Sequence, residues 1–178
     1  SRKHMRKFMM ATLLAITTIC PSIVFAQTST YASNTACLIA AAWNEARGRS
    51  TPEVVAVMYV VLNRVKHAKF KAQNACDVVL AKGQFQMTSS VRNMVVTAKR
   101  TGRVNLNLTQ PADQKAFQRI SAIAHVIQDG HTNDPSGGAT HFYSPKLRVI
   151  MGLPKSPNWA LKLKRTTVIG EFHFHHDM

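Results

Sequence analysis

The segment that decides the fold is Ala40–Gly48, which reads AAAWNEARG. At helical spacing, one otherwise apolar face of this region carries Leu38, Ala41, Ala42 and Glu45. That face must be buried, and a carboxyl group held against an apolar surface has a raised pKa. Glu45 is therefore a candidate general acid near neutral pH. The alternative is that Glu45 bends into solvent at the helix end, or pairs with Arg47 or Arg49.

Glu45 also differs from the other acidic residues of the chain. The sequence has eight of them: Glu45, Glu53, Asp77, Asp113, Asp129, Asp134, Glu171 and Asp177. Glu53 and Asp113 are explained by positions near the starts of expected helices. Asp134 belongs to a turn, and Asp129 ends a helix. Glu45 is the acid least explained by local structure.

The N-terminal segment has the organisation of a secretory signal. It begins with four basic residues, Arg2, Lys3, Arg6 and Lys7. An apolar run from Met9 to Ala26 follows and ends in a small residue, which predicts cleavage after Ala26. The run is near the lower length limit for spanning a membrane, so an uncleaved anchor is the alternative. A lipoprotein signal is disfavoured because the bulky Ile19 precedes Cys20.

We therefore expect an exported protein with one domain after the signal. We expect Met5 to be the natural start and residues 1–4 to be a remnant of expression. Residues 27–34 are small and polar, and we expect a flexible lead-in there. Residues 35–178 are long enough for one domain with a substantial core. The processed protein is expected to be a monomer in the periplasm or outside the cell, without stable membrane insertion.

The net charge restricts the partners. Removal of residues 1–26 would take away four basic and no acidic residues, which lowers the net charge from +15 to +11. Such a basic protein favours a polyanion: nucleic acid, an anionic membrane surface or an anionic wall polymer. We do not expect nucleic acid, because the protein is exported and carries no nucleic-acid-binding motif. The charges are scattered, so a merely solvated basic surface is the alternative.

Two cysteines, Cys37 and Cys76, remain after processing. An oxidising compartment would allow them to form a disulfide. The bridge would tie the helix of Glu45 to the segment after the next helix, with a stabilisation of about 3 to 4 kcal/mol. Since any two cysteines make one arithmetic pair, free thiols are the alternative.

The order of the expected elements indicates an α+β domain. Helices are expected at about residues 35–47, 51–66, 75–80, 89–101 and 111–129. Thr51 is expected to cap the second helix, whose wide apolar face makes it the expected central helix. Residues 139–143 predict a strand, 144–157 a loop, and the segments on either side of Gly170 a hairpin. Helices followed by a small antiparallel sheet define the class.

A zinc site is the main chemical competitor. His173 and His175 alternate on one strand face, His141 could lie on a neighbouring strand, and Asp177 shares their parity. The sequence has no H-E-x-x-H helix, however, and such a strand is often only an exposed polar face. A Ser-His-Asp triad lacks the G-x-S-x-G turn, and Cys-His catalysis conflicts with the disulfide. We therefore expect no metal, and zinc chemistry is an alternative.

Four motifs resemble those of one enzyme family. They are Asn44–Gly48 (NEARG), Val61–Val65 (VLNRV), Gly83–Phe85 (GQF) and Asp134–Tyr143 (DPSGGATHFY). Further matching positions are Glu53, Pro145, Trp159, Ile169, Gly170 and Phe174. In this order they resemble the SleB-type cell-wall hydrolases, the spore-cortex-lytic enzyme family, over about residues 36–175.

The resemblance implies a lysozyme-like, mainly helical fold and cleavage of the peptidoglycan β-1,4 bond between N-acetylmuramic acid and N-acetylglucosamine. It places Glu45 in the position of the family's catalytic acid. It also implies that the enzyme is a lytic transglycosylase that uses no cofactor. The substrate would be a glycan strand. The residues implied to line the saccharide groove are Gln84, Phe85, Thr140, His141 and Tyr143. Phe85 and Phe142 could instead be simple core residues.

The chain departs from the family pattern at two places. Gln86-Met87 stands where a Ser-Pro pair is common, and Glu171-Phe172 follows Gly170, so that histidine comes only at position 173. We therefore transfer no role to the terminal histidines. The chain lacks a separate wall-binding repeat, which suits a compact lysin or a remodelling enzyme. The alternative functions are a basic wall-binding module without catalysis and a zinc-dependent peptidoglycan amidase.

Overall fold

A computed structural model describes residues 21–177. Most of the expected signal, residues 1–20, lies outside the described residues, so the signal and its cleavage stay predictions. The helices are α1 (Pro21–Ala46), α2 (Thr51–Lys66), η1 (Ala68–Phe70), α3 (Ala75–Leu80), α4 (Ser89–Thr101), α5 (Pro111–Gln128), α6 (Pro145–Ile150) and η2 (Asn158–Leu161). The strands are β1 (His141–Tyr143), β2 (Lys164–Ile169) and β3 (Phe172–His176).

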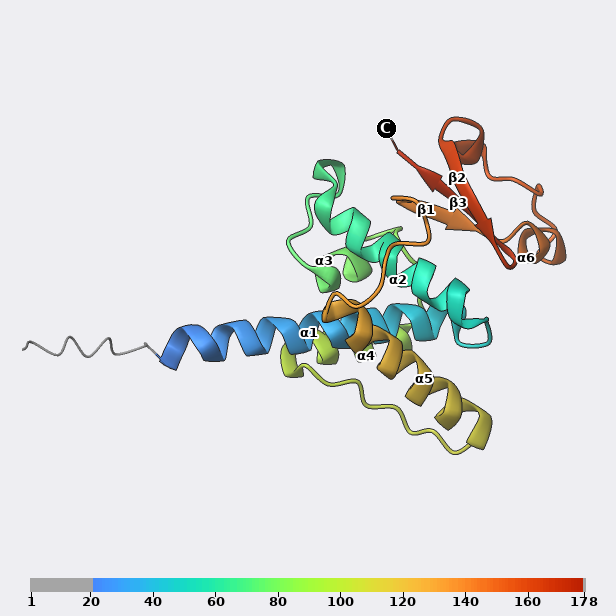
Figure 1. Cartoon of the computed structure of the whole chain (residues 1–178). Coiled ribbons are helices and arrows are strands. Elements are labelled where there is room, and N and C mark those ends of the chain that lie inside the picture. The colour runs from blue at the N-terminus through green and yellow to red at the C-terminus, as the bar shows by residue number, and fades with distance from the viewer. Residues whose placement is uncertain (1–20, 178) are drawn as a thin grey trace, which may run out of the picture.

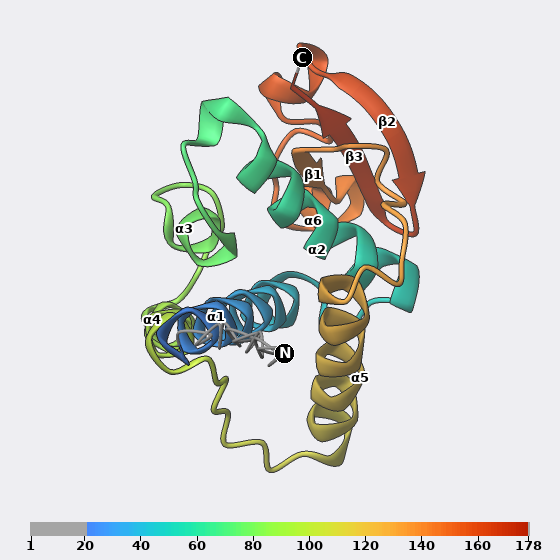
Figure 2. The same ribbon diagram turned by 60° about the vertical axis from the view of Figure 1, so that its left-hand side comes forward.

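The first five α-helices form one lobe, and the sheet forms a second part at its end (Figure 1). This arrangement confirms the α+β class and the mainly helical lobe followed by a small antiparallel sheet. α2 is buried as expected and lies between α1 and the sheet. α1 nevertheless packs against α2, α3, α4 and α5, and Figure 2 shows it between α4 and α5. Its run of small residues, Ala40–Ala42, lets neighbouring helices approach closely.

α1 begins earlier than its sequence predicts. It starts at Pro21 rather than near Thr35, so residues 27–34, expected to be a flexible lead-in, continue the helix. Two long-range hydrogen bonds explain the order of its middle turns. The Tyr31 hydroxyl donates to the Asp129 carboxylate at 2.6 Å, and Ser33 Oγ donates to the Lys99 carbonyl at 2.9 Å. Contacts so distant in sequence have no local pattern that could predict them.

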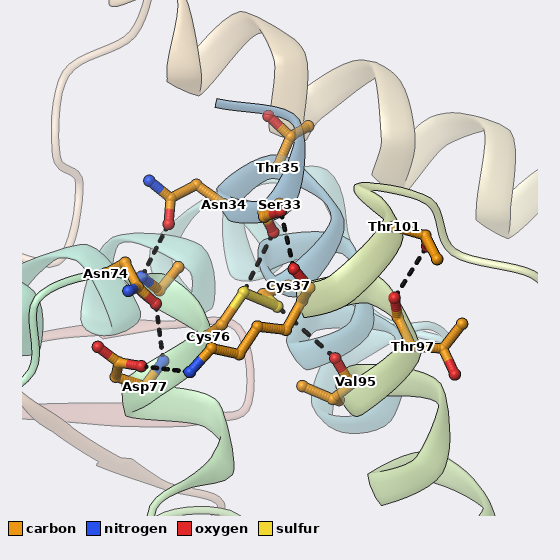
Figure 3. Close-up of a disulfide and its surroundings, with 12 residues drawn as sticks. Ser33, Asn34, Thr35, Cys37, Asn74, Cys76, Asp77, Val95, Thr97 and Thr101 are labelled. Atoms are coloured by element: carbon orange, nitrogen blue, oxygen red, sulfur yellow. Dashed lines mark hydrogen bonds and ion pairs between the residues drawn. A yellow bond between two sulfur atoms is a disulfide. The ribbon is translucent and has the colours of Figure 1, made fainter. Parts of the chain in front are cut away.

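A disulfide joins Cys37 of α1 to Cys76 of α3, the pairing expected for an oxidising compartment (Figure 3). The two Cα atoms are 5.2 Å apart. Beside the bridge, the Ala75 amide donates to Asn34 Oδ1 at 3.0 Å, and the Asp77 amide donates to the Asn74 side chain at 3.0 Å. The first turn of α3 is therefore held to α1 both covalently and by hydrogen bonding.

Glu53 connects the helical lobe to the hairpin. The N-cap of α2 is Ser50 and not Thr51, which was expected to cap the helix. The Ser50 amide and hydroxyl donate to Glu53 Oε2 at 3.0 and 2.7 Å. Oε1 accepts from the Glu171 amide at 3.0 Å. Gly170 has φ +57°, and a Cβ there would lie 2.2 Å from Glu53 Cδ. Only glycine fits this contact.

The sheet has the order β1-β3-β2 with antiparallel pairing. Phe142 lies opposite Phe174, and this face packs into the core, where Phe174 is fully buried. Because neighbouring residues of a strand point to opposite faces, His141 and Tyr143 belong to the other face. β1 is an edge strand, and its side chains reach the junction between the two parts of the molecule.

The stretch 144–157, expected to be a loop, contains the short helix α6. Ser144 Oγ accepts from the Leu147 amide at 3.1 Å, and Pro145 occupies the first turn, which suits its missing N–H. No residue of this helix is buried. Among residues 21–177, no helix has the length and apolar character needed to cross a membrane.

Candidate active site

A groove of about 460 Å³ lies where the helical lobe meets β1. Its walls come from α1, α2, the loop at residues 83–86, β1, the start of β3, α6 with the segment after it, and η2. The side chains that line it include Glu45, Arg49, Arg64, Gln84, Phe85, Gln86, His141, Phe142, Tyr143, Leu147, Arg148, Met151, Leu153 and Trp159. The groove thus brings together residues that are about 100 positions apart in sequence.

Glu45 is half-buried in the last turn of α1 and lines the groove. Burial raises the pKa of its carboxyl group above the ordinary value, and this outweighs the Asn44 hydrogen bond and the Arg64 charge, which both lower it. Asn44 Nδ2 donates to Glu45 Oε1 at 2.6 Å and to the Gln86 carbonyl at 3.1 Å. The carboxyl group is therefore oriented by its neighbour and shifted toward its protonated form.

Neither arginine considered as a partner of Glu45 pairs with it. Arg47 lies over the Trp43 ring, with its Cζ atom 5.4 Å from the ring centroid. Arg49 forms a salt bridge with Glu171 instead. In the part of the chain that the structure describes, none of the salt bridges involves Glu45. The carboxyl group can thus act as an acid without first breaking an ion pair.

Arg64 is a charged residue of the groove wall for which the sequence argument gave no role. Its side chain is only 5% exposed, and its Nε donates to the Thr140 carbonyl at 2.6 Å. The guanidinium lies between two rings, 5.3 Å from Phe70 and 5.1 Å from Phe85. Burial lowers the pKa of Arg64 to about 10, although the Glu45 charge opposes this, so Arg64 is a cation at neutral pH.

A sequence signal for Arg64 does exist. Val57, Val61 and Arg64 fall at i, i+4 and i+7, so this arginine shares the buried stripe of α2. It is the same pattern that singles out Glu45 on α1.

Asn63, beside Arg64, fixes the segment that leads into β1. Its Nδ2 donates to Asp134 Oδ2 at 2.9 Å and to the Ala139 carbonyl at 3.0 Å. Asp134 also accepts from the Ser136 amide at 2.8 Å and the Gly138 amide at 3.0 Å. The turn-rich loop is therefore rigidly attached to α2, and this positions β1 along the groove.

Four of the five residues expected to bind saccharide line the groove: Gln84, Phe85, His141 and Tyr143. Thr140 does not, because it is 1% exposed and lies behind the groove wall. Its Oγ1 accepts from the Asp177 amide at 3.1 Å, and its carbonyl accepts from Arg64. Phe85 and Phe142 both line the groove and pack against the core, so a role in the groove and a role in the core are compatible for each of them.

An aromatic wall stands on the β1 side of the groove. The Trp159 ring centroid is 5.1 Å from that of His141 and 5.6 Å from that of Tyr143. Burial, together with the nearby Arg64 charge, lowers the pKa of His141 to about 4. His141 is therefore neutral at physiological pH. Aromatic faces beside an uncharged hydrogen-bonding group suit the binding of a sugar ring on this side of the groove.

The candidate zinc ligands are not grouped for metal binding. Within residues 21–177, no three His, Cys, Asp or Glu side chains come together in a way that could hold a metal ion. His173 Nδ1 is 3.4 Å from the Tyr143 hydroxyl, and His175 Nδ1 is 3.4 Å from the Leu163 carbonyl. Asp177 forms a salt bridge with Lys69. The grouping expected for the zinc alternative is not found.

The family model described as Cell Wall Hydrolase matches residues 48–175. The chain belongs to the cell wall hydrolase family. Membership makes it an enzyme that acts on cell-wall peptidoglycan. The matched region contains Arg64, His141 and Tyr143 but begins three residues after Glu45, so the part played by Glu45 depends on the geometry of the groove.

The chain is also similar to an individual protein of known structure. Among solved structures, this family member is similar to the catalytic domain of the Bacillus cereus SleB protein. The identity is 20%, the TM-score is 0.47, and the match covers 83% of this chain and 90% of that chain. A comparison with curated proteins found no match.

Proposed function

We propose that the protein cleaves the β-1,4 bond between N-acetylmuramic acid and N-acetylglucosamine in peptidoglycan, with Glu45 as the general acid. The observation that carries this proposal is a half-buried carboxyl group of raised pKa, without an ion-pair partner among the described residues, in a groove with an aromatic wall. A protonated carboxyl group at this place can donate to a glycosidic oxygen. Gln84, Phe85, His141 and Tyr143 would hold the sugars on either side of the bond.

The carboxylates near the groove favour a mechanism with one acid. Ordinary glycoside hydrolysis uses two carboxyl groups on either side of the scissile bond. Glu45 is the acidic residue that lines this groove in the described chain. The Glu53 carboxylate accepts hydrogen bonds from Ser50 and from the Glu171 amide. The Glu171 carboxylate forms salt bridges with Arg49 and Lys146. We therefore propose a lytic transglycosylase.

In this mechanism one carboxyl group serves twice. Glu45 first donates its proton to the glycosidic oxygen, and the bond between that oxygen and C1 of the muramic acid breaks. The C6 hydroxyl oxygen of the same sugar then attacks C1, while the Glu45 carboxylate accepts the hydroxyl proton. The product is a 1,6-anhydro ring, and Glu45 is again protonated. No water is consumed, so a second carboxylate that activates water is unnecessary.

Export is part of the proposal, because the substrate lies outside the cytoplasm. The Cys37–Cys76 disulfide supports it, since disulfides persist in oxidising compartments. Exposing the purified protein to sacculi and recording the mass spectra of the released fragments tests the reaction. A muramic end lighter by one water supports the transglycosylase, whereas a reducing end indicates a muramidase. Free stem peptides whose release a chelator stops would indicate an amidase, and binding without release a non-catalytic module.

A further inference from the structure

A patch of exposed apolar side chains lies on α6 and the turn after it. We call it the α6 patch; its members are Leu147, Val149, Ile150, Met151 and Leu153. Their exposed fractions are 48, 58, 71, 56 and 44%. Five large apolar residues exposed within seven positions differ from the single ones found elsewhere on the described surface. Clustered exposure of this kind marks an interaction site.

The α6 patch has two sides with different surroundings. Leu147, Met151 and Leu153 line the groove, but Val149 and Ile150 do not. Those two residues are the most exposed of the patch, and Figure 1 shows α6 at the outer edge of the molecule. A glycan strand bound in the groove would leave them uncovered. Their partner is therefore something other than the bound sugar.

The charges around the α6 patch are positive. Arg148 and Lys155 occur within or beside it, Lys146 is paired with Glu171, and the sequence from Ser144 to Val168 contains no Asp or Glu. The nearest acid in sequence, Glu171, is neutralised by Arg49 and Lys146. Aliphatic side chains surrounded by cations are complementary to a surface with anionic headgroups above an apolar interior.

We propose that the α6 patch docks reversibly on the surface of an anionic phospholipid membrane, with Val149 and Ile150 entering the headgroup region. A second copy of the chain fits less well, because two such patches would bring like charges together. A hydrated wall polymer offers no apolar surface for aliphatic side chains. Docking would place the rim of the groove at the membrane, so that, if the proposed function holds, strands close to the membrane are cut first.

The test has to separate the α6 patch from the apolar N-terminal run, which could itself hold the full chain on a vesicle. An environment-sensitive fluorophore is therefore attached at Ile150→Cys, and at Leu161→Cys in a matched control, both in a Cys20→Ser background. Leu161 is 81% exposed and lies outside the patch. Any effect of the N-terminal run is the same in both proteins, so only local insertion distinguishes the two labels.

The labelled proteins are mixed with vesicles of phosphatidylglycerol and phosphatidylcholine, and with vesicles of phosphatidylcholine alone. We expect a blue shift at position 150 on the anionic vesicles only, with quenching by lipid labels placed at the boundary between headgroups and acyl chains, about 5–10 Å deep. Position 161 should show neither. Three results would overturn the proposal: equal shifts at positions 150 and 161, a shift at position 150 that is as large on neutral as on anionic vesicles, or no shift at all. A blue shift at position 150 that grows with protein concentration without lipid would show a second copy instead.

The same assay separates this proposal from the catalytic one. A Glu45→Gln substitution in the labelled protein should leave the shift unchanged, because Glu45 is not part of the α6 patch. Wall lysis is measured on sacculi free of lipid. Failure of the membrane proposal therefore leaves lysis intact, and failure of the catalytic proposal leaves the shift intact.

Discussion

At the scale of the residue, the Glu45 carboxyl group is subject to opposing influences. Burial raises its pKa, whereas the Asn44 amide and the Arg64 charge lower it. Arg64 therefore limits how far the pKa can rise, and it does so from a buried position fixed by the Thr140 carbonyl and two aromatic rings. It is a positioning and tuning residue and not the general acid, because a pKa of about 10 keeps its proton bound at neutral pH.

Replacing Arg64 by Met should move the pH profile of the reaction. A general acid must be protonated, so activity falls as the pH rises through the pKa of Glu45. Removing the Arg64 charge removes an influence that lowers this pKa, and the alkaline limb should move to higher pH. The measurement is the pH dependence of kcat/KM on soluble glycan strands. Arg64→Lys, which keeps the charge, should leave the limb near its wild-type position, and identical limbs in both variants and the wild type would contradict the role.

Replacing Glu45 by Gln should abolish lysis without unfolding the protein. Gln has nearly the same shape but cannot donate the proton, so we expect a loss of about a hundredfold to ten-thousandfold in kcat. The thermal midpoint should stay close to that of the wild type. Glu171→Gln is the matched control, because this half-buried carboxylate is paired with two cations and has no place in the mechanism. Retained lysis by the Glu45 variant would remove this residue from the mechanism.

At the scale of the element, the contact between Glu53 and the hairpin turn joins α2 to the sheet. Gly170→Ala should destabilise the protein by more than the cost of positive φ alone, since its Cβ would overlap the Glu53 carboxylate. Gly130→Ala is the matched control, because Gly130 has φ +75° and nothing within 4 Å of its Cβ position. We expect about 1–2 kcal/mol for Gly130→Ala and about 1–3 kcal/mol more for Gly170→Ala. Urea unfolding measures both, and equal losses would show that the contact relaxes freely.

The same scale explains what the sequence could predict. α4 ends at Thr101 before Gly102, and α5 begins at Pro111, because caps and breakers act on their own neighbours. α6 was missed because its one local signal, Ser144 before Pro145, stands in a Pro- and Gly-containing stretch. The turns of α1 around Tyr31 and Ser33 are held by hydrogen bonds to Asp129 and Lys99, which no local pattern contains.

Some residues of the candidate site could likewise be predicted from the sequence, and others could not. The position of Glu45 on a buried stripe could be read from α1 alone, and the resemblance to a family supplied most of the groove residues. Thr140 was misplaced because a short strand does not tell which side chains face the groove and which face the segment behind it. The stripe position of Arg64 could be read from α2 alone, but its place in the groove and the wall formed by α6 depend on contacts between distant segments.

At the scale of the whole molecule, the groove exists only where the helical lobe and the sheet meet. Its catalytic candidate is at the end of α1, while its aromatic wall belongs to β1 and η2. The orientation of α1 within the helical lobe therefore decides the position of Glu45 relative to the sugar-binding wall. The disulfide fixes that helix two turns before Glu45, by attaching Cys37 to α3.

Removing the disulfide should therefore lower the stability of the whole domain while the chemistry of the groove is preserved. The bond spans a sequence separation of 39 residues, and in the chain-entropy model a loop of that length contributes about 4 kcal/mol. Cys37→Ala/Cys76→Ala should unfold at a clearly lower urea concentration, and reductant should lower the wild-type midpoint but not that of the variant. Neither cysteine lines the groove, so lysis at low temperature should persist. If the variant and the wild type unfold at the same midpoint with the same slope, the disulfide is not what holds α3 against α1, and the hydrogen bond from Ala75 to Asn34 is sufficient.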